Sequence, residues 1–311
     1  MVKPWAAEQI VTNDVALELI STQFPELVPV TVKLIGEGFD NTVYQVNEQY
    51  VFRFPRRSIA VDLLLVECAL LPHLYSLGLP LAVSEPVFIG KPEERYLWPF
   101  AGYRFIVGES PGVITVEQRM QSALPLAQFL SMLHRFPVAK AKELGVPNDL
   151  LGRLDLTKRL SQVDSNMNKA MELGLWSDRR VLDVFLSSLG DGENIKESGN
   201  SSFTQCLVHG DLHIRNVLAD DNQLISGVID WGDVHIGHPA VDLSFVYSYL
   251  PWEGRRMFFS IYGEADTATL KLARFRSIHI SLLLLLYGYD QQDDSLVAAT
   301  QDSLRLAFED L

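Results

Sequence analysis

The chain has 311 residues, of which 48% are hydrophobic and 21% are charged. This length favours two lobes or domains, and this composition excludes an intrinsically disordered chain, because a large apolar core can form. The formal net charge of −13 argues against a nucleic-acid partner, since Lys and Arg bind phosphate backbones. The N-terminal residues lack an apolar signal core, and the longest apolar run, 280–286, is too short to cross a membrane. A cytoplasmic protein without a membrane partner is therefore expected.

The first third of the chain predicts a small sheet with two helices. Apolar residues at helical spacing predict helices at 5–22 and 60–76. Alternating apolar and polar residues predict strands at 30–36, 42–46, 50–55, 81–90, 95–100 and 101–108.

The turn between the first two of these strands contains Gly36, Gly38 and Asn41. Glycines in such a turn let backbone N–H groups approach the phosphate oxygens of a ligand. An ordinary hairpin turn is the alternative interpretation.

Two charged residues are predicted to form a pair. Arg53 lies in the third strand, and Glu67 lies inside the apolar helix that follows it. A buried Glu without a partner is costly, so Arg53 is its expected partner. The alternatives are an exposed strand Arg beside Arg56 and Arg57 and a partly exposed helix Glu.

The rest of the chain is predicted to be mainly helical. Helices are expected at 117–135, 155–175, 178–189, 240–250, 254–262, 267–288 and 293–309. The run 281–287 is apolar on all sides and predicts a buried helix. The range 190–202, rich in Gly, Ser and Asn, predicts a mobile linker.

The residues that carry the chemistry lie between 207 and 242. His209-Gly210-Asp211 is followed by Asn216, and Asp230-Trp231-Gly232 comes after a hairpin-like segment. Each of the two motifs follows an apolar strand-like run, where a carboxylate is costly unless a cation or a hydrogen-bond donor meets it. A surface hairpin with solvated Asp residues is the alternative.

This set resembles the protein-kinase pattern H-R-D-x-x-x-x-N followed by D-F-G. Together with G-H-P-x-x-D-L at 237–243, it is similar to the aminoglycoside phosphotransferase family, over about residues 30 to 300. The resemblance implies an α+β, bilobal protein-kinase-like fold. The N-lobe, residues 1–104, would have a five-stranded antiparallel sheet plus a helix and would bind nucleotide. The C-lobe, residues 105–311, would be mostly helical and hold the catalytic loop and the acceptor.

The resemblance also implies roles for individual residues. Asp211 would accept the proton of the attacking hydroxyl or orient it, and Asn216 and Asp230 would hold Mg²⁺ against the phosphates of ATP or GTP. The remaining nucleotide contacts would come from Gly36, Gly38, Asn41, Arg53 with its partner Glu67, and the hinge residues Arg104, Phe105, Ile106 and Val107. Kinases carry Lys where this chain has Arg53, which is a departure from the usual pattern.

Two further residues are given structural roles by the same resemblance. Asp242 is expected to anchor the catalytic loop through backbone N–H groups, and His134 is expected to pack and hydrogen-bond within the C-lobe.

The expected function is nucleotide-dependent O-phosphorylation of a small hydroxylated molecule by a monomer. An aminoglycoside antibiotic is the first candidate acceptor, which would make the enzyme a resistance factor, and a macrolide is the second. A metabolic kinase for a sugar, choline or an amino acid, and a pseudokinase that binds without catalysis, are the alternatives. A cluster of acids would suit a polyamine sugar, and the candidates are Asp233, Glu253, Asp266, Asp290, Asp293 and Asp294.

Overall fold

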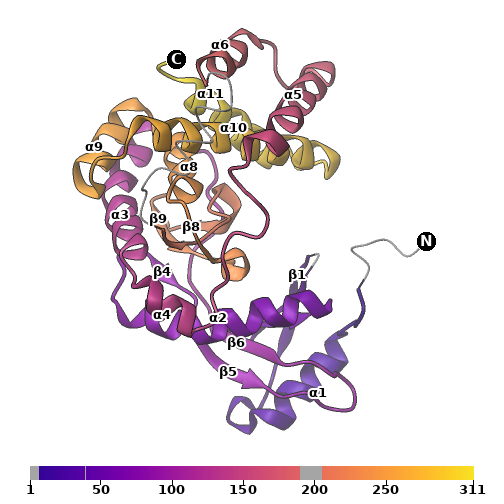
Figure 1. Cartoon of the computed structure of the whole chain (residues 1–311). Helices are drawn as coiled ribbons and strands as arrows, with labels where there is room; N and C mark the ends of the chain where they lie inside the picture. The colour runs from indigo at the N-terminus through magenta and orange to yellow at the C-terminus, as the bar shows by residue number, and fades with distance from the viewer. Residues whose placement is uncertain (1–6, 39, 190–204) are drawn as a thin grey trace.

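The computed structural model describes residues 7–38, 40–189 and 205–311 (Figure 1). A strand-rich N-terminal part and a mostly helical C-terminal part form the α+β, bilobal architecture that the sequence predicts. The N-terminal elements are α1 (Asn13–Gln23), η1 (Pro25–Leu27), β1 (Val32–Glu37), β2 (Asn41–Val46), β3 (Tyr50–Pro55), α2 (Ser58–Ser76), β4 (Ala82–Val83), β5 (Pro86–Gly90) and β6 (Phe100–Arg104).

Five of these strands form one sheet in the order β1-β2-β3-β6-β5. Every neighbouring pair is antiparallel, which confirms the predicted N-lobe sheet. Alternate side chains of β2 and β3, such as Tyr44 and Phe52, point into an aromatic core that α1 closes from one side. Because β6 ends at Arg104, the sheet stops beside the predicted lobe boundary; the boundary itself stays a prediction.

The first helix is shorter than the sequence predicts. It begins at Asn13 instead of residue 5, because the Thr12 side chain caps it by accepting a hydrogen bond from the Val15 N–H. Residues 1–6 lie outside the described part of the chain, and Ile10 is exposed. Gln9 donates its backbone N–H to the Arg56 carbonyl, so the chain before α1 lies beside the end of β3 instead of forming a helix.

The strands predicted at 81–90 and 95–100 are also corrected. The first range splits into β4 and β5, and β4 leaves the N-lobe sheet to pair in parallel with β9 (Ile225–Val228). In the second range, Tyr96 pairs across a tight turn with Glu93, and its hydroxyl donates to the Pro55 carbonyl. The apolar pattern that predicted a strand at 95–100 includes Tyr96, whose buried side chain belongs to a turn. The next strand, β6, begins at Phe100.

The described residues of the C-terminal part contain seven helices predicted in sequence and one, α4, that was not. Its elements are α3 (Val116–His134), α4 (Val138–Glu143), α5 (Leu156–Glu172), α6 (Arg180–Ser188), β7 (Cys206–Val208), η2 (Ile214–Asn216), β8 (Val217–Ala219), β9 (Ile225–Val228), η3 (Trp231–Asp233), β10 (His235–Gly237), α8 (Ala240–Tyr249), α9 (Trp252–Tyr262), α10 (Thr267–Asp290) and α11 (Asp294–Phe308). The predicted linker at 190–202 lies outside the described residues.

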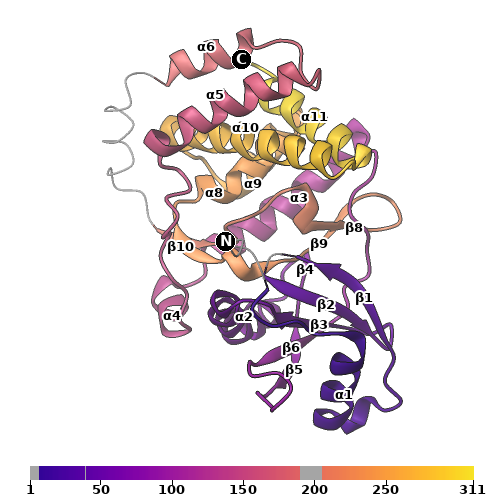
Figure 2. The same ribbon diagram turned by 90° about the vertical axis from the view of Figure 1, so that its right-hand side faces the viewer.

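The long helix α10 is the centre of this lobe and packs against α5, α8 and α11 (Figure 2). Residues 272–279 of this helix are all buried, but the run 281–287 is not buried on all sides as predicted. Leu282 and Leu285 are in the core, whereas Leu283 is 42% exposed and Tyr287 is 38% exposed. The helix therefore presents an apolar surface at its C-terminal end.

Among the described helices, only α2 is long and apolar enough, by length and composition, to cross a membrane. In this fold its apolar residues have other neighbours, since Leu64, Leu70 and Leu71 belong to the protein core. Its central residue Glu67 is buried and faces the cleft between the lobes, where it contributes to the candidate site.

Candidate active site

The loop predicted to be catalytic, residues 209–216, is held in shape by a buried carboxylate. Asp242 of α8 accepts the backbone N–H groups of His209 at 2.7 Å and of Gly210 at 3.0 Å. The ring of His134 lies 3.2 Å from the same carboxylate. Burial would raise the pKa of Asp242, but the contact with His134 and the backbone donors outweigh it and hold the pKa below its usual value. The predicted anchoring role of Asp242 and the hydrogen-bonding role of His134 are confirmed.

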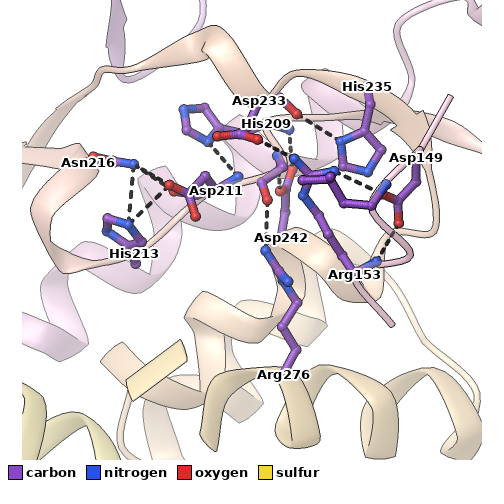
Figure 3. A network of polar contacts seen from close by, with 12 residues as sticks. Asp149, Arg153, His209, Asp211, His213, Asn216, Asp233, His235, Asp242 and Arg276 are labelled. Carbon is purple, nitrogen blue, oxygen red and sulfur yellow. Dashed lines mark hydrogen bonds and ion pairs between the residues drawn. The ribbon is translucent and has the colours of Figure 1, made fainter. Parts of the chain in front are cut away.

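Glycine is required at position 210 of this loop. Gly210 has φ +90, and a Cβ atom there would lie 2.1 Å from the carbonyl oxygen of Asp233. The Gly210 carbonyl accepts a hydrogen bond from Arg276 Nη2 at 2.8 Å. Arg276 reaches the loop from α10 and is buried (Figure 3). The sequence prediction missed Arg276, although two Arg residues within a helix rich in apolar residues were a signal for it.

Asp211 and Asn216, predicted to act together, do lie side by side (Figure 3). Asn216 Nδ2 donates to the Asp211 backbone carbonyl at 2.8 Å and to its carboxylate at 3.2 Å. His213 Nε2 lies 3.2 Å from the same carboxylate, a contact that the sequence prediction did not assign. Burial would raise the pKa of Asp211, but His213 and Arg276 outweigh it and hold the pKa well below its usual range. Asp211 is therefore a fixed, ionised carboxylate.

The second motif is joined to the catalytic loop through the backbone. The Ile229 N–H donates to the Asn216 carbonyl at 2.9 Å, and the His209 ring bonds the Ile229 carbonyl at 3.0 Å. Asp230 follows in a left-handed conformation, with φ 64 and ψ 68. Such a backbone is uncommon for a residue other than glycine and clusters at functional sites. It brings Asp230 to the same cleft as Asn216.

The predicted ion pair between Arg53 and Glu67 is confirmed and extended. Arg53 Nη1 lies 2.9 Å from Glu67 Oε1, and Arg53 Nη2 lies 2.7 Å from Asp230 Oδ1. The Tyr103 hydroxyl, which the sequence prediction missed, donates to Glu67 at 2.8 Å. Burial would lower the pKa of Arg53, but the charges of Glu67 and Asp230 raise it above its usual value. Arg53 therefore joins the helix α2 to the second motif.

The side chains of Asn216 and Asp230 fit a magnesium ion in the chemistry of their donor atoms. Because Asn216 donates its amide N–H groups to Asp211, its oxygen atom remains for a cation. Burial would raise the pKa of Asp230, but Arg53 helps to hold it below its usual value. Asp230 therefore supplies a carboxylate. In the described part of the chain no group of three or more His, Cys, Asp or Glu could hold a metal. Phosphate oxygens and water would complete the shell, which is the usual arrangement for Mg²⁺.

A cleft of about 410 Å³ lies between the lobes. Its lining combines apolar side chains of both lobes with polar ones, among them Arg53, Asn216 and Asp230. The apolar residues include Ile35, Val43, Val51, Ile106, Leu218 and Ile229. A flat aromatic base with a charged phosphate tail matches a lining that holds both apolar and charged side chains.

The hinge residues are only partly arranged as predicted. Arg104, Phe105 and Ile106 line the cleft, but Val107 is 82% exposed and is not one of the described lining residues. The backbone N–H groups of Arg104 and Phe105 already donate to the carbonyls of Glu85 and Gln49. The edge of a purine base would therefore hydrogen-bond other polar groups of residues 104–107.

The loop with Gly36, Gly38 and Asn41 forms a hairpin turn in which the Gly38 N–H donates to the Asn41 carbonyl at 3.0 Å. Arg56 holds the turn through the Gly38 carbonyl at 2.9 Å. Among the described lining residues of the cleft are Ile35 and Val43, but neither glycine. In the part of the chain that is described, the buried Asn41 Oδ1 has no hydrogen-bond partner. Phosphate binding by this loop stays a prediction.

The acids considered for an acceptor site are dispersed. Asp266 and Asp293 cap the N-termini of α10 and α11, by accepting the N–H groups of Thr269 and Leu296. Asp233 is ion-paired with Arg153 (Figure 3). Local capping and an ion pair therefore occupy three of the six candidate acids.

Comparison with known proteins supports a common origin. A model of the phosphotransferase enzyme family matches residues 31–276. The chain is similar to the GDP and kanamycin complex of APH(2")-IIia, with a TM-score of 0.65 and 27% identity, covering 94% of this chain and 97% of that chain. It shares the fold of macrolide 2'-phosphotransferase MphH from Brachybacterium faecium, with a TM-score of 0.59 and 20% identity, covering 94% of this chain and 98% of that chain.

Two curated proteins match over shorter stretches. Viomycin phosphotransferase from Streptomyces vinaceus is 36% identical over 93 residues, 29% of this chain and 32% of that protein. The uncharacterized protein YcbJ from Bacillus subtilis (strain 168) is 36% identical over 64 residues, 21% of this chain and 17% of that protein. These matches span less than a third of each relative. With the family model covering most of the chain, the protein belongs to the phosphotransferase enzyme family, a family of kinase-like enzymes that transfer phosphoryl groups.

Proposed function

We propose that this protein transfers the γ-phosphoryl group of ATP or GTP to a hydroxyl group of a small antibiotic-like molecule. The observation that carries the proposal is that Asn216 and Asp230 line a cleft of about 410 Å³, and that the Asp211 carboxylate lies 3.2 Å from Asn216 Nδ2. Solved relatives bound to GDP or ATP support the choice of donor. The presence of all three residues argues against a pseudokinase that only binds.

In the proposed reaction, the acceptor oxygen bonds to the γ-phosphorus while the bond from that phosphorus to the leaving nucleoside diphosphate breaks. Asp211 orients the hydroxyl by accepting its hydrogen bond. Since its low pKa makes Asp211 a weak base, it takes the proton only as the oxygen becomes bonded to phosphorus. Arg53 contacts the phosphate chain, and Glu67 keeps Arg53 in place. Mg²⁺, when held by Asn216 and Asp230, would neutralise phosphate charge.

Two acceptor classes are candidates. Aminoglycosides come first, because the neighbours at 26–27% identity are aminoglycoside phosphotransferases and one of them holds kanamycin. Macrolides are the second class, and a specific observation favours them. Three of the acids that could bind a polyamine are engaged elsewhere, whereas Leu283 and Tyr287 expose apolar surface on α10.

The test is nucleotide turnover with ATP and GTP in parallel, against kanamycin, gentamicin, streptomycin, a macrolide, choline and homoserine. Mass spectrometry of the acceptor should show one added phosphoryl group. The expected result is turnover that depends on one class of antibiotic. The Asp211→Asn variant is the matched control for contaminating kinases. If no acceptor in the panel gains a phosphoryl group above that control, the proposed function is wrong.

A further inference from the structure

Three arginines are among the described residues that line the cleft, and two of them are paired with acids. Arg53 is held between two carboxylates, and Arg104 is ion-paired with Glu85. The third is Arg215. In the ranges that the structure describes, its guanidinium forms no ion pair and donates no hydrogen bond to the protein. Arg215 is therefore the lining cation whose charge has no counterion in the described chain.

The backbone of Arg215 is fixed, although its side chain is exposed. Arg215 lies in η2, and its N–H donates to Nδ1 of His213, the residue that caps this turn, at 3.3 Å. Asn216, the next residue, is buried. The Arg215 side chain extends towards α10, where its guanidinium lies 5.1 Å from the ring centroid of Tyr287. The fold therefore places this charge at the cleft without pairing it.

Arg215 belongs to the segment that carries the proposed metal ligand and the acid that orients the acceptor. It directly precedes Asn216, so the Cα atoms of these two residues are about 3.8 Å apart. Asn216 in turn donates to the Asp211 carboxylate, as Figure 3 shows. Arg215, Asn216 and Asp230 all line the cleft. A metal ion held by Asn216 and Asp230 would bridge the β- and γ-phosphates, so Arg215 lies next to the place of those phosphates.

The charges in the cleft favour a further cation beside the phosphates. Arg53 faces two carboxylates, Glu67 and Asp230, so this group of three carries a net negative formal charge. Such a charge repels a nucleoside triphosphate unless cations outweigh it. A guanidinium presents several N–H donors in a planar fork that matches a phosphate group. A contact with an aromatic ring does not occupy those donors, so Arg215 can bind phosphate while it stays beside Tyr287.

We propose that Arg215 is a phosphate-binding residue of the nucleotide site. Its guanidinium contacts the phosphate chain of a nucleoside di- or triphosphate from the loop 209–216, whereas Arg53 does so from β3. The ring of Tyr287 positions the guanidinium. The proposal rests on the nucleotide binding of the proposed function and adds a residue to that site. Because nucleotide binding is measured without an acceptor, the result does not depend on which acceptor the enzyme uses.

Calorimetric titration of the wild type and Arg215→Gln tests the contact. The titrants are ATP, ADP and adenosine with Mg²⁺, and GTP, GDP and guanosine in parallel. The Kd of the di- and triphosphates should rise by about 10-fold in the variant, the effect of a lost hydrogen bond to a charged group. The Kd of the nucleosides should stay within about twofold, because they carry no phosphate. The Tm should be unchanged, because the side chain is exposed.

Two comparisons make the test specific. Arg180→Gln is the matched control, because it removes the same charge at a side chain that is 88% exposed and is not among the described lining residues of the cleft. It should leave every Kd unchanged. Tyr287→Leu removes the ring and should raise the Kd of the di- and triphosphates less than Arg215→Gln does. The double variant should bind them no more weakly than Arg215→Gln, because the ring acts through Arg215.

The outcomes separate this proposal from the proposed function. A loss of affinity that depends on the phosphates and is confined to Arg215→Gln and Tyr287→Leu supports the phosphate contact. An unchanged Kd in Arg215→Gln, an equal rise for the nucleosides, or an equal rise in Arg180→Gln would overturn the contact alone. A wild type that shows the contact but phosphorylates no acceptor would overturn the proposed function alone. A folded wild type that binds no nucleotide would overturn both.

Discussion

Arg53 and Asp230 are 177 residues apart in sequence, yet Arg53 Nη2 lies 2.7 Å from Asp230 Oδ1. The other end of the same guanidinium contacts Glu67. The pair therefore links the N-lobe sheet, helix α2 and the second catalytic motif. A planar guanidinium with several donors can hold two carboxylates at once, which the single ammonium of a Lys does less well. This geometry gives a structural reason for Arg at this position.

Arg53 and Glu67 should behave as a unit. Removing one partner of a buried ion pair leaves an uncompensated charge, so Arg53→Ala should destabilise the protein by about 3–5 kcal/mol. It should also raise the nucleotide KM and lower kcat. The double variant with Glu67→Gln should cost clearly less than the sum of the two single variants, because the effects of contacting residues are not additive.

Arg53→Lys is the control for charge. It keeps one positive charge but loses the fork, so its activity should lie between those of Arg53→Ala and the wild type. Denaturant unfolding and steady-state kinetics provide the two measurements. A silent Arg53→Ala variant would show that the phosphates are held without this residue.

The metal assignment predicts that Asp230→Ala abolishes Mg²⁺-dependent nucleotide binding. Asp230 is the only carboxylate of the proposed pair, since Asn216 supplies an amide oxygen. Calorimetric titration of nucleotide with and without Mg²⁺ measures the effect. Asp233→Ala is the comparison, because this nearby acid is paired with Arg153. Equal loss of Mg²⁺ dependence in both variants, or in neither, would contradict the assignment.

The catalytic loop predicts a large effect of a single methyl group at Gly210. Gly210→Ala would force a positive φ on a residue with a side chain and place its Cβ 2.1 Å from the Asp233 carbonyl oxygen. We expect a loss of stability of about 1–3 kcal/mol, typical of such backbone strain, and a fall in kcat. Gly174→Ala, which has φ +71 but no atom within 4 Å of the added Cβ, controls for strain without the clash. Thermal unfolding of both variants checks this prediction.

The sequence predicted the parts of the site that are close together in the chain. Asp211, Asn216 and Asp230 were predicted from their spacing, and the pair of Arg53 with Glu67 from the cost of a buried charge. Contacts set by tertiary packing were missed, because nothing local to Gly210 indicates Arg276, which is 66 residues away.

Where the prediction of elements was wrong, a tertiary contact or a cap explains the error. The turn around Tyr96 was assigned to a strand, since its buried ring gives a strand-like pattern. Asp266 and Asp293 were considered for acceptor binding, although Asp before a helix is a common N-cap.

The pKa of Asp211 predicts how the reaction depends on pH. Its folded-state pKa lies below its usual value, so the stability that its contacts contribute is present above about pH 4 and is lost as the pH falls through the folded pKa. The carboxylate stays ionised through the neutral range. The kcat of the enzyme should therefore show no ionisation of Asp211 between about pH 5 and 8. An Asp211-dependent inflection in that range, absent from Asp211→Asn, would contradict this prediction.

The central claim is that Asp211 acts on the acceptor hydroxyl at a nucleotide-filled cleft. The most direct measurement compares Asp211→Asn with the wild type, by nucleotide calorimetry and by single-turnover transfer of labelled γ-phosphate to the acceptor. The account predicts nucleotide affinity near that of the wild type and a transfer rate reduced by about 10²–10⁴-fold, the range for lost acid–base assistance. Wild-type transfer by Asp211→Asn would contradict it.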